Sequence, residues 1–253
     1  MKTFARNALL ASTFLMASAG SSQANPTSFS LSADYVTEYV FRGTTLAGEA
    51  FQPGAELAFG DFTAGVWASI AVGEESIAFD DEIDFYASYT FAPTETISLD
   101  VGATLYHYPQ SGGVLDIGTG AGDASTLEFF GSASFDAPLE PTFTVNYDIT
   151  LETLTVIGTA GYSFPISENT SFDLGATAGH VETSGAGDYT YGILSGALSF
   201  AMSETSSFYV SANFGISSDD TFADIDFDPA NPFSVGLSQD NSFWLGIGFS
   251  SGF

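Results

Sequence analysis

The sequence predicts an all-β protein: a transmembrane, antiparallel up-and-down β-barrel of about 12 strands. Three observations support this fold class. Apolar and polar residues alternate along most of the chain, tight connections alternate with long ones, and aromatic residues recur at the tight connections. Beyond the N-terminal segment no run of about 18 consecutive apolar residues occurs, which excludes a spanning helix.

The N-terminal segment has the features of a secretory signal peptide. Lys2 and Arg6 precede an apolar run over residues 8–17, and a small-residue exit site ends at Ala24. The run is too short to span a membrane as a helix. We therefore expect residues 1–24 to be removed and residues 25–253 to form one outer-membrane barrel domain. The chain has no Cys, so neither a disulfide framework nor a cysteine-linked lipid anchor is expected.

The alternation has a period of two residues, which is typical of strands with one apolar and one polar face. Most of the alternating segments are near the length of about 9–11 residues that a tilted strand needs to cross a bilayer. The twelve expected strands cover residues 28–42, 50–60, 62–73, 82–92, 96–108, 125–136, 142–150, 153–164, 170–181, 189–201, 206–217 and 241–253.

The connections are of two kinds. Tight ones begin at an aromatic residue and are expected to face the periplasm, with the aromatic residues forming a girdle: Phe59, Phe91, Phe135, Phe164 and Phe200. Longer, Gly-rich or acidic connections are expected to be extracellular, and either of two, 109–125 or 217–240, could fold into the lumen. This asymmetry indicates the outer membrane of a Gram-negative bacterium, whereas a soluble two-sheet sandwich does not explain it.

The charge is extreme. Without the signal peptide, Arg42 is the only Lys or Arg against 31 Asp and Glu. Nucleic acid is excluded as a partner, because its phosphates would be repelled. Expected partners are lipid, lipopolysaccharide and small cations or solutes. The outer-membrane assembly machinery is a further expected partner, because the alternating C-terminal segment ends in Phe253.

The polar faces of the strands carry small residues and carboxylates, with Glu38, Glu56, Asp84 and Asp100 among the expected pore-lining acids. Rings of Asp and Glu favour cations. The sequence therefore predicts a narrow, acidic, cation-preferring porin. The alternative is a barrel without transport, such as an adhesin, a surface coat or an enzyme, whose acids solvate a plugged lumen.

Arg42 lies in the stretch EYVFRGTTL, residues 38–46, and shares the polar face of the first expected strand with Glu38. We expect it to point into the lumen and to act as a latch that pins the first two strands or fixes an inward loop. Glu56 on the next strand is the expected partner, because a guanidinium can bind a carboxylate with two hydrogen bonds. The alternative is an interfacial arginine that reaches towards lipid headgroups.

Catalysis and metal binding have little support. The only two histidines, His107 and His180, stand near the loop ends of expected strands, where an interfacial role is more common than that of a general base. Asp224, Asp226 and Asp228 alternate in one loop, but Pro229 follows where a calcium loop of the EF-hand type needs glycine. We expect no enzyme activity and no cofactor. A loose divalent site that bridges to lipopolysaccharide phosphates stays open, with a solvated acidic loop as the alternative.

Residues 32–69 resemble the opening of the TorF-type (Gcw_chp) porin family of proteobacterial outer-membrane proteins. The resemblance rests on Tyr35, the Tyr39-Val40-Phe41-Arg42-Gly43 run, Gln52-Pro53 and Gly65-Val66-Trp67-Ala68-Ser69. It implies a Gram-negative outer-membrane β-barrel that acts as a porin. It implies neither a substrate nor catalytic residues.

Overall fold

The computed structural model describes residues 27–72, 81–120, 123–223 and 237–253. The expected signal peptide, its cleavage site at Ala24 and the alternating aspartates at 224–228 lie outside these residues. In the described part of the chain, no helix is long and apolar enough to cross a membrane.

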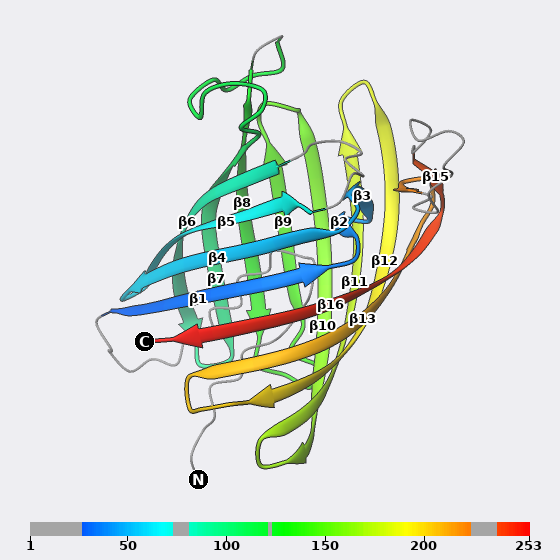
Figure 1. The fold of residues 1–253 in the computed structure, drawn as a ribbon. Helices are drawn as coiled ribbons and strands as arrows, with labels where there is room; N and C mark the ends of the chain where they lie inside the picture. The colour runs from blue at the N-terminus through cyan, green and yellow to red at the C-terminus, as the bar shows by residue number, and fades with distance from the viewer. Residues whose placement is uncertain (1–26, 73–80, 121–122, 224–236) are drawn as a thin grey trace.

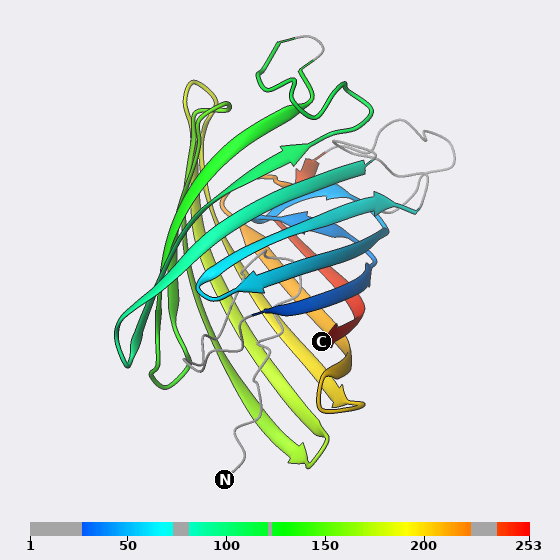
Figure 2. The same cartoon turned by 90° about the vertical axis from the view of Figure 1, so that its left-hand side faces the viewer.

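Twelve strands form one closed antiparallel barrel, as the sequence predicts (Figures 1 and 2). Each strand pairs with its neighbours along the chain, and the first and last strands pair to close the ring. The barrel strands are β1 (Ser28–Val36), β4 (Ala50–Phe59), β5 (Phe62–Ala71), β6 (Asp81–Thr94), β7 (Ile97–His107), β8 (Ser125–Phe135), β9 (Thr142–Asp148), β10 (Thr153–Ser167), β11 (Thr170–Thr183), β12 (Gly187–Ala201), β13 (Ser206–Ser217) and β16 (Asn241–Gly252).

The alternation places apolar side chains outside and polar side chains inside. Along β7, Val101 is half exposed on the outer wall whereas Thr104 is buried on the inner wall. The same division holds on most strands, so the outer wall is a continuous apolar surface. Buried inner-wall residues of this polar kind include Thr63, Ser88, Thr144, Asn146, Thr159, Thr177, Ser211 and Asn213.

The two ends of the barrel differ. At the turn end, β4–β5, β6–β7 and β10–β11 are joined by two residues each, and Gly60 adopts a φ of +59° in the first of these turns. The expected aromatic residues lie at this end, where Phe59, Phe91 and Phe164 are exposed on the outer wall. The connections at the opposite end, the loop end, are mostly longer (Figure 1).

The first strand is shorter than expected. β1 ends at Val36 instead of continuing to residue 42, and the chain then forms a separate hairpin of β2 (Tyr39–Phe41) and β3 (Thr44–Ala47) before it enters β4. We call residues 37–49 the inward hairpin. A second small sheet, β14 (Phe222–Ala223) with β15 (Leu237–Gln239), lies at the same end. Of the two connections expected to fold inward, 109–117 is mostly exposed, and the described part of 217–240 contacts the inward hairpin.

Candidate functional site

The inward hairpin has a tight two-residue turn made by Arg42 and Gly43. Their φ values are +51° and +75°, and positive φ at both central residues is the mark of a type I′ hairpin turn. Gly43 suits this turn because it has no Cβ, and a Cβ there would lie 2.4 Å from Cβ of Tyr191. Arg42 has no such freedom, so its left-handed backbone costs roughly 1–2 kcal/mol that other contacts must offset.

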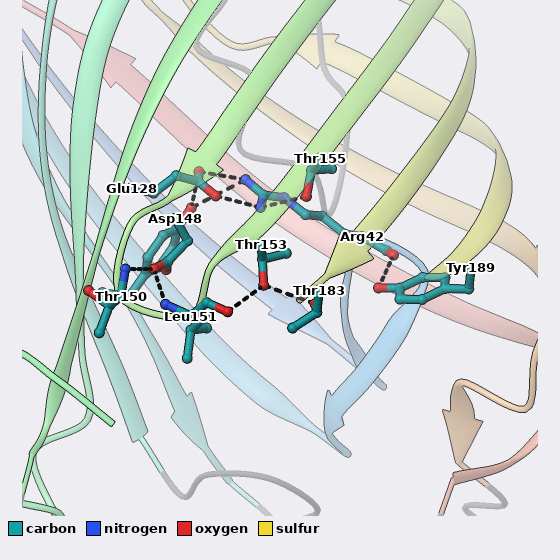
Figure 3. Close-up of polar contacts among 10 residues, drawn as sticks. Arg42, Glu128, Asp148, Thr150, Leu151, Thr153, Thr155, Thr183 and Tyr189 are labelled. Carbon is teal, nitrogen blue, oxygen red and sulfur yellow. Dashed lines mark hydrogen bonds and ion pairs between the residues drawn. The ribbon is translucent and has the colours of Figure 1, made fainter. Parts of the chain in front are cut away.

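The Arg42 side chain provides those contacts across the lumen (Figure 3). Its Nη1 donates to Oε2 of Glu128 on β8 at 2.6 Å, and its Nη2 donates to Oε1 at 2.6 Å. Nη1 also donates to the hydroxyl of Thr155 on β10 at 3.3 Å, and the Tyr106 hydroxyl donates to Glu128 at 2.9 Å. The hydroxyl of Tyr189 donates to the Arg42 carbonyl at 3.1 Å.

These contacts join opposite walls of the barrel. The hairpin leaves the wall between β1 and β4, whereas β10 stands six strands from β4 in the ring of twelve. Arg42 is 9% exposed and Glu128 only 2%, so the ion pair is buried. A bidentate pair of a guanidinium and a carboxylate is among the strongest charge-assisted hydrogen bonds in proteins. The inward hairpin is therefore fixed across the lumen by one bidentate ion pair.

Further polar contacts hold the base of the hairpin. The Tyr39 hydroxyl donates to Glu82 on β6 at 2.9 Å. Glu38 accepts hydrogen bonds from the hydroxyls of Thr45 on β3 and Ser242 on β16. Burial raises the pKa of the Glu38 carboxyl above its ordinary value, and these two hydrogen bonds offset part of the rise.

Apolar packing fills the space around the hairpin. Val40 lies fully buried in a cluster with Tyr191, Phe222 and Trp244, which come from β12, β14 and β16. On the other side of the hairpin, Tyr39 packs in a second cluster with Val36, Ala47 and Ala50. Among the described residues, side chains from the hairpin and the barrel wall therefore pack tightly together in the loop half of the lumen.

Four buried carboxyl groups line the wall that Arg42 faces. We call Glu82 and Asp84 on β6, Glu128 on β8 and Asp148 on β9 the acidic arc. Glu128 and Asp148 are direct cross-strand neighbours. Asp148 accepts hydrogen bonds from the backbone N–H groups of residues 150 and 151 at 2.7 and 2.8 Å. Asp84 Oδ1 is buried without a hydrogen-bond partner among the described residues.

The turn half of the lumen is more open. Glu56, Asp100 and Asp173 lie there, and Asp34 lies nearer the loop end of β1. All four are partly exposed, and each accepts a hydrogen bond from a hydroxyl. The donor to Asp34 is Tyr209 at 2.7 Å. The lumen thus holds carboxyl groups at two levels, buried beside the inward hairpin and partly exposed further towards the turns.

The structure places the five predicted site residues as follows. Glu56, Asp84 and Asp100 face the lumen, Glu38 lies at the base of the inward hairpin, and Arg42 lies at its tip. The expected pairing of Arg42 with Glu56 is wrong. Glu56 instead accepts a hydrogen bond from Tyr86 at 3.1 Å. Arg42 stands on a hairpin and not on β1, so it reaches a different wall.

Sequence reasoning missed Glu128. It follows Arg42 by 86 residues, and no local pattern joins the two. One signal was available: Glu128 stands on the polar face of an expected strand, in the same phase as Ser132 and Ser134. Sequence reasoning also missed the end of the first strand, for which Thr37 was the available signal. Continued alternation needs an apolar side chain at this position, and β1 ends just before it.

His107 does not act as a general base towards Ser125, its nearest hydroxyl neighbour. Its Nδ1 lies 3.0 Å from the Ser125 hydroxyl and 3.2 Å from the carbonyl oxygen of Ala124. A carbonyl only accepts, so Nδ1 carries the proton and cannot take one from Ser125. The serine hydroxyl is also buried and donates to the carbonyl of Val114 at 3.0 Å.

Comparison with solved structures shows the class of fold. The chain resembles the KdgM porin with a TM-score of 0.55 at 11% identity, over 88% of this chain and 99% of that one. A KdgM porin in complex with disordered oligogalacturonate gives 0.52 at 11% identity, over 89% and 99%. An outer-membrane channel (COG4313) from Pseudomonas putida F1 gives 0.49 at 10% identity, over 90% and 95%. The two KdgM matches, together with the closed ring of strands, show that the chain has the fold of an outer-membrane β-barrel.

The family comparison covers less of the chain. A family model described as a bacterial protein of unknown function (Gcw_chp) matches residues 20–118. This range contains residues 32–69, on which the resemblance seen in the sequence rests. No curated protein matches the chain.

Proposed function

We propose that the protein is a Gram-negative outer-membrane porin that forms a narrow, acidic, cation-preferring channel for passive diffusion of ions or small solutes. The charge of the lumen carries this proposal. The acidic arc and the partly exposed carboxyl groups further towards the turns line the barrel, and Arg42 is the only Lys or Arg among the described residues. Carboxylates that face a pore attract cations and repel anions.

The same charge argues for a class of solute. One similar structure is a porin in complex with oligogalacturonate, a polyanion. In this chain a polyanion would pass carboxylates at both levels of the lumen, with one guanidinium to offset them. We therefore infer that the channel admits cations and small neutral solutes and rejects acidic saccharides.

The inward hairpin supplies the closed state of the channel. It fills the loop half of the lumen, so conduction requires the hairpin to move or to loosen. The test is single-channel recording in planar bilayers under a KCl gradient. We expect a cation-selective reversal potential that weakens as the Debye length falls from about 10 Å at 0.1 M to about 3 Å at 1 M salt. Anion preference would refute the acidic-lumen proposal.

One observation favours a second candidate, a barrel without transport. The side chains around Val40 and Trp244 are fully buried, so the loop half of the lumen is packed like a protein core. A variant in which a short linker replaces residues 38–48 separates the two candidates. Ion current through the wild-type barrel as well as the variant supports the channel, whereas a folded wild type without current beside a conducting variant supports the non-transporting barrel.

The remaining partners belong to the same proposal. The apolar outer wall is suited to contact outer-membrane lipid, with the longer loops towards lipopolysaccharide and the turn end towards the periplasm. Phe253 pairs through its backbone with Phe29, and its side chain is 75% exposed. We propose this side chain as the contact for the assembly machinery. A Phe253→Ala variant that reaches the outer membrane at the wild-type level would contradict that role.

A further inference from the structure

We propose that the acidic arc is a binding site for cations that carry a guanidinium group, and that Arg42 is its tethered occupant. The inference deepens the proposed cation channel by naming the class of solute. Its binding test does not depend on transport.

The contacts of Arg42 define what the site recognises. Glu128 offers two carboxylate oxygens at 2.6 Å from the two terminal nitrogens, in the parallel arrangement that a planar guanidinium requires. The hydroxyls of Thr155 and Tyr106 accept from the same nitrogens at 3.3 and 3.5 Å. The guanidinium carbon lies 4.6 Å from the centroid of the Phe41 ring. All of these groups except Phe41 belong to the barrel wall and stay in place when the hairpin moves.

The site has more carboxyl groups than its occupant pairs with. Four carboxyl groups form the acidic arc, and one guanidinium faces them. Asp84 gives an independent indication that the site lacks a hydrogen-bond donor. Its side chain is 3% exposed, interacts with Glu82 through a side-chain hydrogen bond, and interacts electrostatically with Glu128 and Arg42. Its Oδ1 atom nevertheless has no hydrogen-bond partner among the described residues. A buried carboxylate oxygen without a donor is costly, and a cation with further N–H groups would satisfy it.

Arg42, the tethered occupant, stands on the inward hairpin, a segment that can move away from the acidic arc. Arg42 is at the tip of a two-residue turn with a strained, left-handed backbone, and the hairpin is not part of the barrel sheet. A solute with the same head group therefore competes with the tip of the hairpin for Glu128. In this arrangement, entry of the solute and release of the hairpin are one exchange reaction at one carboxylate.

Chemical rescue tests the site. Arg42→Ala removes the occupant and leaves the wall intact. We expect it to lower the temperature at which the barrel loses its folded, heat-modifiable gel mobility. Millimolar guanidinium chloride, far below denaturing concentrations, should restore part of the loss. Urea, which has a similar shape but no charge, and NaCl at the same ionic strength should not.

A second variant links the rescue to Glu128. In Arg42→Ala/Glu128→Gln the apparent affinity for guanidinium should fall about tenfold or more, because an amide carries no negative charge and offers one acceptor oxygen instead of two. Equal rescue by NaCl, or equal rescue of the double variant, would overturn the proposal. If Arg42→Ala does not fold, Arg42→Lys takes its place, because an ammonium group cannot form the two parallel hydrogen bonds.

Failure of this inference differs from failure of the channel. Rescue by guanidinium without any ion current supports the site and refutes transport. Current without rescue leaves the channel standing and overturns the site. If both hold, guanidinium should permeate the wild-type barrel better than tetramethylammonium, a cation without N–H groups. An equal or lower permeability for guanidinium would overturn the assignment of the solute class.

Discussion

Replacing Arg42 by Gln removes the ion pair that spans the lumen and leaves a polar, uncharged side chain that is two bonds shorter. Glu128 then stays buried at 2% exposure without its counter-charge and beside three other carboxyl groups. Breaking a buried pair by removing one partner costs about 3–5 kcal/mol. Gln is also a non-glycine residue at φ +51°, so the substitution does not relieve the backbone strain of the turn.

This cost acts on the docking of the inward hairpin, because the barrel sheet does not include it. A loss of about 3–5 kcal/mol lowers the ratio of docked to undocked hairpin by a factor of about 150 to about 5,000. Single-channel recordings should therefore show more open time and more noise for Arg42→Gln than for the wild type. Cation preference should also rise, because the variant lacks the one described luminal cation.

The double variant Arg42→Gln/Glu128→Gln is the matched control. No buried charge is left alone in the double variant, so most of the loss should be recovered. A double-mutant cycle on the open fraction measures the coupling between the two residues. If the current traces and the ion selectivity of Arg42→Gln match those of the wild type, Arg42 does not act as a latch. A double variant as open as the single one would show that Glu128 is not its partner.

Three other predictions concern the same hairpin and the topology of the barrel. Gly43→Ala should also open the channel, because the added Cβ would collide with Tyr191 at a position where φ is +75°. Gly60→Ala is the control: it has a similar φ of +59° but open space around it, so the recordings should not change. Because burial raises the pKa of Glu38 above 4.5, docking of the hairpin is favoured at low pH and weakens as the pH rises through the raised value. In single-channel recordings the open fraction of Glu38→Gln should therefore be lower than that of the wild type, and the difference should grow with pH. A difference that is constant with pH would contradict this cause. Protease added to intact cells should cut loop-end segments such as 109–120 and spare the turn at 92–96, and cleavage at that turn would invert the proposed topology.

The sequence by itself determined the barrel. Alternation with period two is a local property, since neighbouring side chains of a strand point to opposite faces, and it can be read without knowing which strands pair. The strand expected over 206–217 is β13, Ser206–Ser217, and the expected polar face of β7 is its luminal face. The alternation of tight and long connections likewise follows from local composition, and it gave the two ends of the barrel.

Only the tertiary structure decided what fills the barrel. Alternation continues from β1 into β2, so the break at Thr37 is marked by a single polar residue, and Arg42-Gly43 lacks the Asn-Gly or Asp-Gly signature of a tight hairpin turn. The partner of Arg42 depends on how strands far apart in the sequence stand opposite each other once the ring closes. Glu128 meets Arg42 because the barrel brings β8 across the lumen from the inward hairpin, and that distance in space is not encoded in any one segment of the chain.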